Sequence, residues 1–248
     1  SKNTLKNSVF LSTLAGFALA TSAHGAIIFT DSFESPNVAA GTRSTSLIPA
    51  GWDRPTTDPL DGDAAISNSD RAGLYGEVTT VTGSDQFTTS FGDQAAWVWG
   101  GNGGQFLVTN DTGLSSTVAA DTQYTLSWNY GGDRATTASY DVYLLADDGT
   151  NLNVLNAVTG SFSGIQDTSG TDSFTFTTSA APATLGDTLR IRIEAGLSTG
   201  GVNDDSGFND FRNDVIFDNV ELDATVIPEP SVAILGSFGL LALLRRRR

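Results

Sequence analysis

The sequence predicts an all-β protein built as a single two-sheet jelly-roll β-sandwich with a short segment at each end. Runs rich in Thr, Val, Phe and Tyr alternate with clusters of Gly, Asp and Asn along residues 26–226. No stretch of this body shows a sustained helical period. Nine such strands, each with one face exposed to water, fit two packed sheets. The candidate strands are Ala26 to Phe33, Gln94 to Trp99, Gln105 to Thr109, Gln123 to Tyr130, Ser139 to Ala146, Asn151 to Val158, Ser173 to Thr178, Thr188 to Ala195 and Val215 to Asp223.

The first 25 residues have the pattern of a secretory signal peptide. Lys2 and Lys6 precede the apolar stretch Val9 to Ala20, and small residues surround His24. A signal peptidase recognises this order of charge, apolar run and small residues. We therefore expect cleavage before Ala26, with the β-sandwich domain occupying residues 26–226.

Alternation along two strands predicts which side chains face the core. Leu189, Ile191 and Ile193 fall on one side of their strand, and Arg190, Arg192 and Glu194 fall on the other. A second strand places four large residues on one side and polar residues on the other. These four are Tyr124, Leu126, Trp128 and Tyr130.

The last 22 residues, 227–248, have three parts that together indicate a membrane-directed tail. Pro228, Glu229 and Pro230 come first, then the apolar run Val232 to Leu244, and then a basic cluster. Thirteen residues of helix span roughly 20 Å, which is short of the ~30 Å hydrocarbon core. Positive charge after the run would hold the end on the cytoplasmic side of a membrane. The cluster consists of Arg245, Arg246, Arg247 and Arg248.

This tail resembles the PEP-CTERM sorting signal in all three parts. The resemblance implies processing by an exosortase near Pro228 to Pro230, after transient insertion into the inner membrane of a Gram-negative bacterium. It also implies delivery to the cell surface or the exopolysaccharide matrix. The resemblance covers about a tenth of the chain and concerns destination rather than activity.

The composition of the body excludes several kinds of chemistry. Residues 26–226 contain no Cys, Met, His or Lys, and seven arginines stand against 27 acidic residues, a formal net charge of −20. Nucleic acid is therefore an unfavourable partner, and divalent cations are favourable ones. Ser-His-Asp and Cys-His catalysis, lysine Schiff bases and His or Cys zinc sites are all excluded.

Two segments resemble the first and last strands of galactose-binding-like jelly rolls found in bacterial carbohydrate-binding modules. They are Phe29-Thr30-Asp31-Ser32-Phe33-Glu34, followed by Gly51-Trp52, and Phe217-Asp218-Asn219-Val220-Glu221-Leu222. The resemblance implies a structural Ca²⁺ held by Glu34 and Asp218, with Asp31 a further candidate. Oxygen ligands from both ends of the domain suit this ion. The alternative is that Glu34 caps a turn and Asp218 faces water.

Trp97 and Trp99 form a candidate sugar-binding platform. They lie two residues apart in a predicted strand, so both rings project from one face while Ala96 and Val98 occupy the other. Neighbouring polar residues, namely Asn102, Gln105 and Arg134, would then supply hydrogen bonds. The alternative is that the tryptophans belong to the core, where large aromatic residues are common.

These features predict an exported, non-catalytic surface or matrix protein that associates with exopolysaccharide. A structural or adhesive protein that self-associates without binding sugar is the alternative. A glycoside hydrolase needs only a pair of carboxylates, but no motif singles out such a pair. The sequence thus predicts no enzyme activity.

Overall fold

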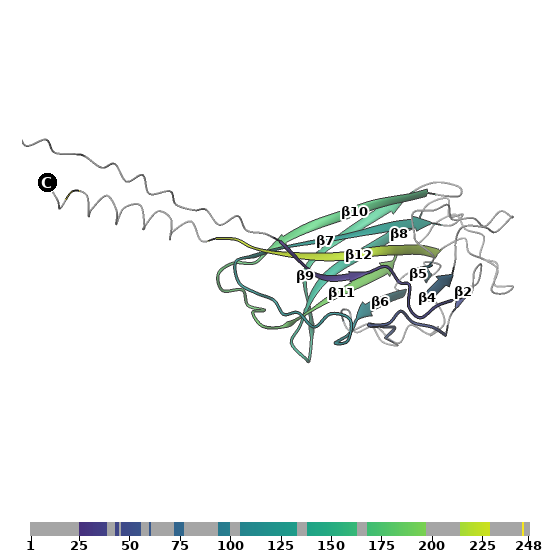
Figure 1. Cartoon of the computed structure of the whole chain (residues 1–248), viewed down its shortest axis with the longest axis horizontal. Coiled ribbons are helices and arrows are strands. Elements are labelled where there is room, and N and C mark those ends of the chain that lie inside the picture. Colours follow the sequence, from purple (N-terminus) through teal and green to yellow (C-terminus); the bar gives the residue numbers. More distant parts are fainter. Residues whose placement is uncertain are drawn as a thin grey trace, which may run out of the picture. The chain divides into compact units, whose positions relative to one another are not determined.

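The structure is a computed structural model that describes most of the predicted body (Figure 1). The described residues are 25–38, 43–44, 46–55, 60, 72–76, 94–99, 105–132, 138–162, 168–196, 214–228 and 245. His24–Ile227 forms one compact unit, and Ser1–Ala23 with Pro228–Arg248 forms another. Within the second unit, the described residues are Pro228 and Arg245.

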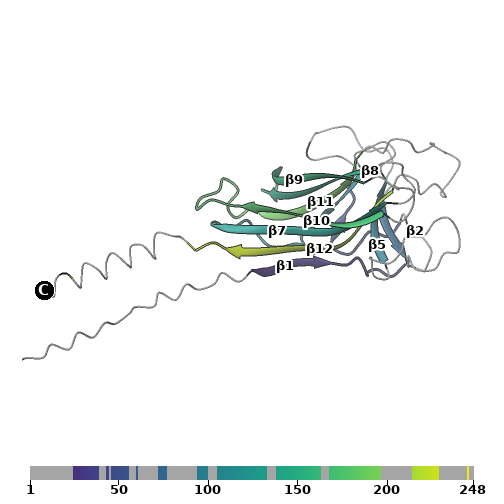
Figure 2. The ribbon, with the colours of Figure 1, turned by 90° about the horizontal axis from the view of Figure 1, so that it is seen from above.

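The larger unit contains two antiparallel sheets, which confirms the predicted jelly-roll sandwich (Figures 1 and 2). The seven-stranded sheet has the order β10 (Thr168–Thr177), β7 (Thr122–Gly132), β12 (Asp214–Val226), β5 (Gln94–Trp99), β4 (Ala72–Gly76) and β2 (Arg43–Ser44), and β1 (Ala26–Asp31) also pairs with β12. The five-stranded sheet has the order β3 (Trp52–Asp53), β6 (Gln105–Thr109), β11 (Thr188–Ala195), β8 (Ala138–Asp147) and β9 (Leu152–Phe162).

The core between the sheets holds the side chains that alternation predicted. Leu189, Ile191 and Ile193 of β11 are fully buried in it. From β7, Tyr124, Leu126 and Trp128 are buried, and Tyr130 packs partly buried against them. Burial of apolar side chains on the facing sides of two sheets is the main favourable term in folding such a domain.

The sequence analysis did not predict strands β2, β3 and β4, and β1 ends earlier than predicted. Strands β2 and β3 are two residues each, and β4 contains two glycines, so none of them shows a readable alternation. Strand β1 ends at Asp31 rather than Phe33. The backbone turns there because Phe33 has a φ of 57° and its amide donates to Asp31 Oδ1 at 2.7 Å.

Two strands share one edge of β12. Residues 214–217 of β12 pair with β5, and residues 220–224 pair with β1. The register of β12 against β7 shifts between Asp218 and Glu221, and Asn219 has a φ of 47°. Asp218 therefore lies at a bulge, where one neighbouring strand gives way to the next.

No described helix is long and apolar enough to cross a membrane. The apolar run 232–244 lies outside the described residues.

Candidate functional site

The three predicted calcium ligands lie at the gap between β1 and β5. Asp218 is fully buried at the bulge of β12. Asp31 ends β1, and its Oδ2 accepts a 2.7 Å hydrogen bond from Trp52 Nε1. Glu34 Oε1 accepts a 3.3 Å hydrogen bond from the backbone N–H of Gln94, which is the first residue of β5. The fold thus brings together carboxylates that lie far apart in the sequence.

The electrostatics of this cluster favour a bound cation. Burial, together with the charges of Glu34 and Asp31, raises the pKa of Asp218 to about 7, against a hydrogen bond from the Asn219 amide that lowers it. Burial also raises the pKa of Asp31, against hydrogen bonds from Phe33 and Trp52 that lower it. The hydrogen-bond donors to Asp218 are the backbone N–H and Nδ2 of Asn219, at 2.7 and 3.0 Å.

The candidate ligands at this gap are carboxylates, which are the oxygen donors that a hard divalent cation takes. The part of the chain that the structure describes contains no group of three His, Cys, Asp or Glu side chains arranged to hold a metal ion. Carboxylate ligands alone would therefore not complete the site as it stands, and calcium binding remains a proposal.

Trp97 does not form an exposed platform. Ala96 and Val98 belong to the core between the sheets, which is the arrangement that a platform requires, and Trp97 lies on the other side of β5. The indole is nevertheless fully buried, and its Nε1 donates to Ser44 O at 3.3 Å. The expectation of an exposed Trp97 is wrong because the segment around Ser44 covers this side of the sheet.

The other residues of the predicted platform are not tested. The side chain of Trp99 is not among those described, and neither is that of Gln105, which lies in β6 opposite Ala195. Asn102 and Arg134 lie outside the described residues altogether, as do Glu229, Pro230 and Arg246 to Arg248 of the tail.

The outer face of the five-stranded sheet is where the structure departs most from expectation. Arg192 pairs with Val108 of β6 and Tyr143 of β8, so these side chains share that face. The guanidinium lies 3.8 Å from the Phe106 ring centroid and binds Glu194 Oε2 at 2.7 Å. Arg192 is only 2% exposed, so the prediction that the outer face of β11 is exposed to solvent is wrong.

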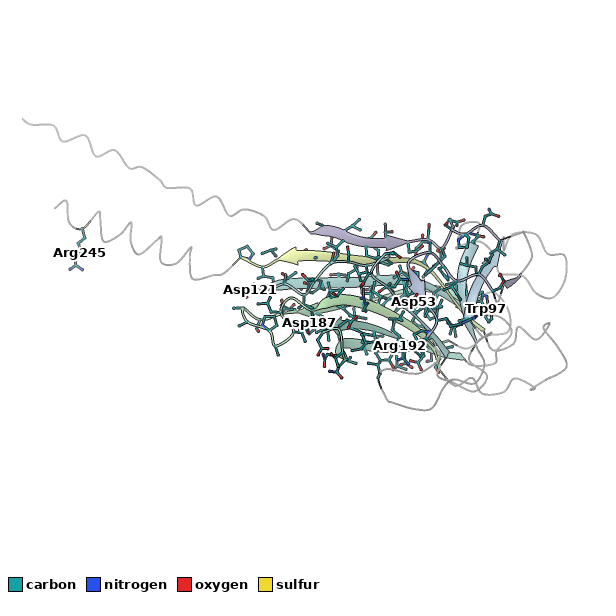
Figure 3. The ribbon with its side chains drawn as sticks, turned by 90° about the horizontal axis from the view of Figure 1, so that it is seen from below. Asp53, Trp97, Asp121, Asp187, Arg192 and Arg245 are labelled. Atoms are coloured by element: carbon teal, nitrogen blue, oxygen red, sulfur yellow. The ribbon has the colours of Figure 1, made fainter. Side chains whose placement is uncertain are left out.

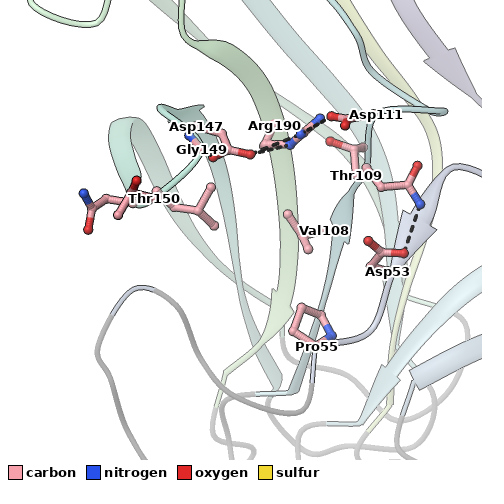
Figure 4. Close-up of a pocket in the computed structure, with 12 residues that line it drawn as sticks. Asp53, Pro55, Val108, Thr109, Asp111, Asp147, Gly149, Thr150 and Arg190 are labelled. Carbon is pink, nitrogen blue, oxygen red and sulfur yellow. Dashed lines mark hydrogen bonds and ion pairs between the residues drawn. The ribbon is translucent and has the colours of Figure 1, made fainter.

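A cleft of about 410 Å³ opens on the same face, beside Arg190 (Figure 4). Arg190 comes from β11, and Val108 from β6 forms part of the cleft wall. The β8–β9 hairpin closes one side of it, and β3 with Pro55 closes another. The lining residues are Asp53, Pro55, Val108, Thr109, Asn110, Asp111, Asp147, Gly149, Thr150, Asn151, Leu152 and Arg190.

The guanidinium of Arg190 organises the polar side of this cleft. Its Nη1 donates to Leu114 O at 3.0 Å, and its Nη2 lies 3.1 Å from Asp147 Oδ2. Asp111 forms a second ion pair with the same nitrogen. Arg190 itself is 8% exposed, whereas the Asp111 side chain is 82% exposed, so the ion pair with Asp147 is the better shielded of the two.

Asp53 is the one acid of the cleft lining that Arg190 does not hold. It lies opposite Val108 in the β3–β6 pair, and Figure 3 places it on the sheet near Arg192. Its Oδ1 accepts from Asn110 Nδ2 at 2.9 Å. Among the described residues Asp53 Oδ2 has no partner, so this oxygen is available to a molecule in the cleft.

The protein belongs to the class of two-sheet jelly-roll sandwiches, with a cleft of small-molecule size on the outer face of one sheet. The sequence model of the HpiC1-like family, described as HpiC1 cyclase, matches residues 26–223, and the chain is a member of this family. No curated protein is similar to the chain.

Solved structures with the same fold include cyclases from Fischerella. A cyclase from Fischerella sp. TAU is 20% identical, with a TM-score of 0.57 over 83% of this chain and 100% of that one. A cyclase from the same source in complex with 4-(1H-indol-3-yl)butan-2-one is 21% identical, with a TM-score of 0.53 over 79% and 95%. A CBM22 xylan-binding domain from Paenibacillus barcinonensis is 10% identical over 84% of this chain and 99% of that one. Its TM-score is 0.44.

Family membership corrects one expectation. The sequence analysis predicted a non-catalytic protein, but the family that the chain belongs to is described by a cyclase, which is an enzyme. Nothing in the sequence indicated this activity, because the body contains no His, Cys or Lys motif and no distinct glycosidase pair. A cyclisation needs none of these, since it joins atoms already present in one substrate.

The cleft residues also escaped sequence analysis, because no pattern in the sequence marks them as parts of a cleft. Arg190 and Arg192 alternate with core residues, a pattern that is typical of an ordinary exposed face. The Asp147-Asp148-Gly149-Thr150 segment has the composition of a hairpin turn and nothing in it indicates a cleft. Asp53 and Asn110 carried no signal, because only the fold brings them together.

Proposed function

We propose that the protein is an enzyme that closes a ring in a small, indole-like substrate held in the Arg190 cleft. The observation that carries this proposal is a cleft of about 410 Å³ in a chain of the HpiC1-like cyclase family. Small-molecule sites usually have volumes of roughly 300–1,000 Å³. A cyclase of the same fold is known in complex with an indolyl ketone, which suggests the substrate class.

Such a cyclisation requires the protein to bind the substrate and to transfer protons. A proton added to the substrate creates a cation, a neighbouring π bond attacks it to form the new C–C bond, and loss of a proton completes an isomerisation. The Asp53 carboxyl group would carry that proton, because Oδ2 faces the cleft without a described partner. Val108, Pro55 and Leu152 would contact the flat apolar part of the substrate.

Turnover by matched variants tests this proposal. Indole-bearing alkenes would be incubated with the protein, and isomers of unchanged mass would be separated by chromatography. We expect Asp53→Asn to lower the rate by about 10²-fold or more, as loss of a proton-transferring group does. Asp148→Asn is the control, since Asp148 lies in the adjacent hairpin but does not line the cleft. Equal activity of both variants would refute the role of Asp53.

A neutral sugar is a second candidate ligand for this cleft. Its rim offers amide, hydroxyl and carboxylate groups from Asn110, Thr150 and Asn151 as well as Asp53. Binding of soluble polysaccharide that Asn151→Ala weakens, without any binding of indoles, would favour this candidate and an enzyme that acts on a carbohydrate.

We also propose export as the setting for this activity. The signal-like residues 1–25 and the tail 227–248 support it, with signal peptidase, exosortase and the inner membrane as transient partners and the cell surface or matrix as the destination. Intact mass spectrometry of the protein recovered from a Gram-negative host tests the proposal. Cleavage before Ala26 and near Pro228 is expected, and an uncut cytoplasmic chain would contradict it.

Calcium would act in this account as a structural ion. Glu34 and Asp218 would hold it with Asp31 beside them, and the burial of Asp218, which opposes its ionisation when no cation is near, supports this assignment. The ion would tie the end of β1 to the bulge of β12 and the start of β5, because all three meet at this point.

A further inference from the structure

One end of the sandwich collects the exposed apolar side chains. Six large hydrophobic residues of the described chain are exposed, and four of them belong to the segments that meet at this end. Their exposed fractions are 58% for Ile27, 55% for Leu185, 64% for Val226 and 38% for Ile227. We call these four residues the terminal patch.

Backbone contacts place the patch residues around two loops. Val226 is opposite Thr122 in the β12–β7 pair, and the Ile227 amide donates to Asp121 O at 2.6 Å. The loop that carries Leu185 is joined to the same region, because the Asp121 amide donates to Ser179 O at 3.1 Å. Figure 3 shows Asp121 and Asp187 at this end of the body.

A second contact fixes the loop that carries Leu185, and pairing places Ile27 nearby. The Gly186 amide donates to Val118 O at 2.9 Å, so Leu185 lies beside the segment before Asp121. Ile27 is opposite Asp223, three residues before Val226 along β12. Leu185, Val226 and Ile227 therefore surround the two loops, and Ile27 lies next to them on β1, on the face that Asp223 occupies.

The loops around the patch lack charge in an otherwise acidic body. Residues 114–120 and 178–186 contain no Asp, Glu, Lys or Arg, whereas residues 26–226 carry a formal net charge of −20. Asp121 and Asp187 follow directly after these loops. A clustered apolar surface with a polar rim is typical of a site that contacts another protein or a membrane.

The path of the chain after β12 indicates what contacts the terminal patch. Strand β12 leaves the sandwich at Ile227, and the apolar run begins at Val232, five residues later. Five extended residues reach about 17 Å at most. Any bilayer that accepts this run must therefore lie within about 17 Å of Ile227.

We propose that the terminal patch docks onto the lipid surface into which the tail inserts. This inference rests on the proposed export and tail insertion, and it adds a defined orientation of the body on the membrane. Leu185, Val226 and Ile227 would enter the headgroup region, as the apolar side chains of peripheral proteins do. Because Asp121 and Asp187 border the patch, zwitterionic lipid is preferred over anionic lipid.

Single-cysteine labelling of the full chain tests the docking. The chain has no cysteine, so Leu185→Cys and Ser169→Cys each introduce one labelling site for an environment-sensitive fluorophore. Ser169 is exposed and pairs with Gly131, eight residues along β10 from the Thr177–Gln123 pair at the patch end. That separation is about 26 Å. The labelled chains are reconstituted in phosphatidylcholine vesicles with or without a headgroup-level lipid quencher.

We expect the quencher to lower the emission of the label at position 185 at least twofold and to leave position 169 unchanged. Added Val226→Asp should restore the emission at 185. Docking is contradicted if the label is quenched equally at both positions. It is also contradicted if the label at 185 is not quenched although the chain co-floats with the vesicles. Either result is still compatible with tail insertion. A chain that does not float with vesicles overturns both. Protection of position 185 that depends on protein concentration and not on lipid assigns the patch to a second copy and overturns the proposal.

Discussion

Asp218 is the buried acid whose environment most opposes its charge. Its side chain is fully buried, and burial together with Glu34 and Asp31 raises its pKa to about 7, while the Asn219 amide lowers it. In the unfolded chain the same carboxyl returns to its ordinary pKa of 3.8. Between these values the folded state keeps a proton that the unfolded state has lost.

This difference predicts a pH dependence without calcium. Because the folded pKa is raised, the stabilisation is complete below about pH 4 and is lost as the pH rises toward 7. A tenfold difference in proton affinity between the two states corresponds to about 1.4 kcal/mol. In chelator, denaturant unfolding should therefore show stability falling by a few kcal/mol across this range relative to Asp218→Asn. Parallel curves for the two proteins would contradict the assignment.

Glu194 neutralises a buried cation on the outer face of β11. Its carboxylate lies 2.7 Å from Arg192 Nη2, and the side chains are 12% and 3% exposed. Removing one member of a buried pair costs about 3–5 kcal/mol, whereas replacing both with apolar residues is nearly neutral. Urea unfolding should therefore show a large loss for Glu194→Gln and a small one for the double change Arg192→Met with Glu194→Leu. A larger loss in the double variant would refute this account.

At the scale of elements, a glycine on β4 lets a second segment lie close to the sheet. A Cβ at Gly73 would be 2.2 Å from Ser44 O, a backbone atom. The same carbonyl accepts from Trp97 Nε1. The segment around Ser44 can therefore cover Trp97 only while position 73 has no side chain.

Gly73→Ala should lift this segment from β5. We expect Trp97 to become accessible, so acrylamide quenching of tryptophan fluorescence should increase and the free energy of unfolding should fall by about 1–3 kcal/mol. Gly149→Ala is a useful comparison, because a Cβ there meets nothing within 4 Å and any cost comes from its φ of 84°. Unchanged quenching in Gly73→Ala would contradict the covering role.

The elements also show how far sequence reasoning reaches. Strand β11 was predicted with its bounds and its core face, because Leu189, Ile191 and Ile193 alternate strictly. Its outer face was misjudged, since the burial of Arg192 depends on Phe106 and Tyr143 from other strands. Similarly, alternation placed Trp97 opposite Ala96 and Val98 but left open which of the two faces is the core, and it gave no sign of the segment that covers Trp97. Alternation reports which side of a sheet a residue occupies and does not report what lies above it.

At the scale of the whole molecule, calcium would join the two ends of the domain. If Glu34 and Asp218 hold the ion, binding to the folded state alone raises the midpoint of thermal unfolding by mass action. We expect a shift of several degrees in wild-type protein and none in Asp218→Asn. A calcium shift that survives in the variant would place the ion elsewhere.

The proposed activity depends on the cleft beside Arg190, which would hold an indole-like molecule. The most direct test is calorimetric titration of 4-(1H-indol-3-yl)butan-2-one into wild-type protein and into Val108→Trp, whose larger side chain would fill the cleft. We predict saturable binding to wild-type protein and a loss of affinity of at least tenfold in the variant. Equal affinity of both proteins, or no binding by wild-type protein, would contradict the claim.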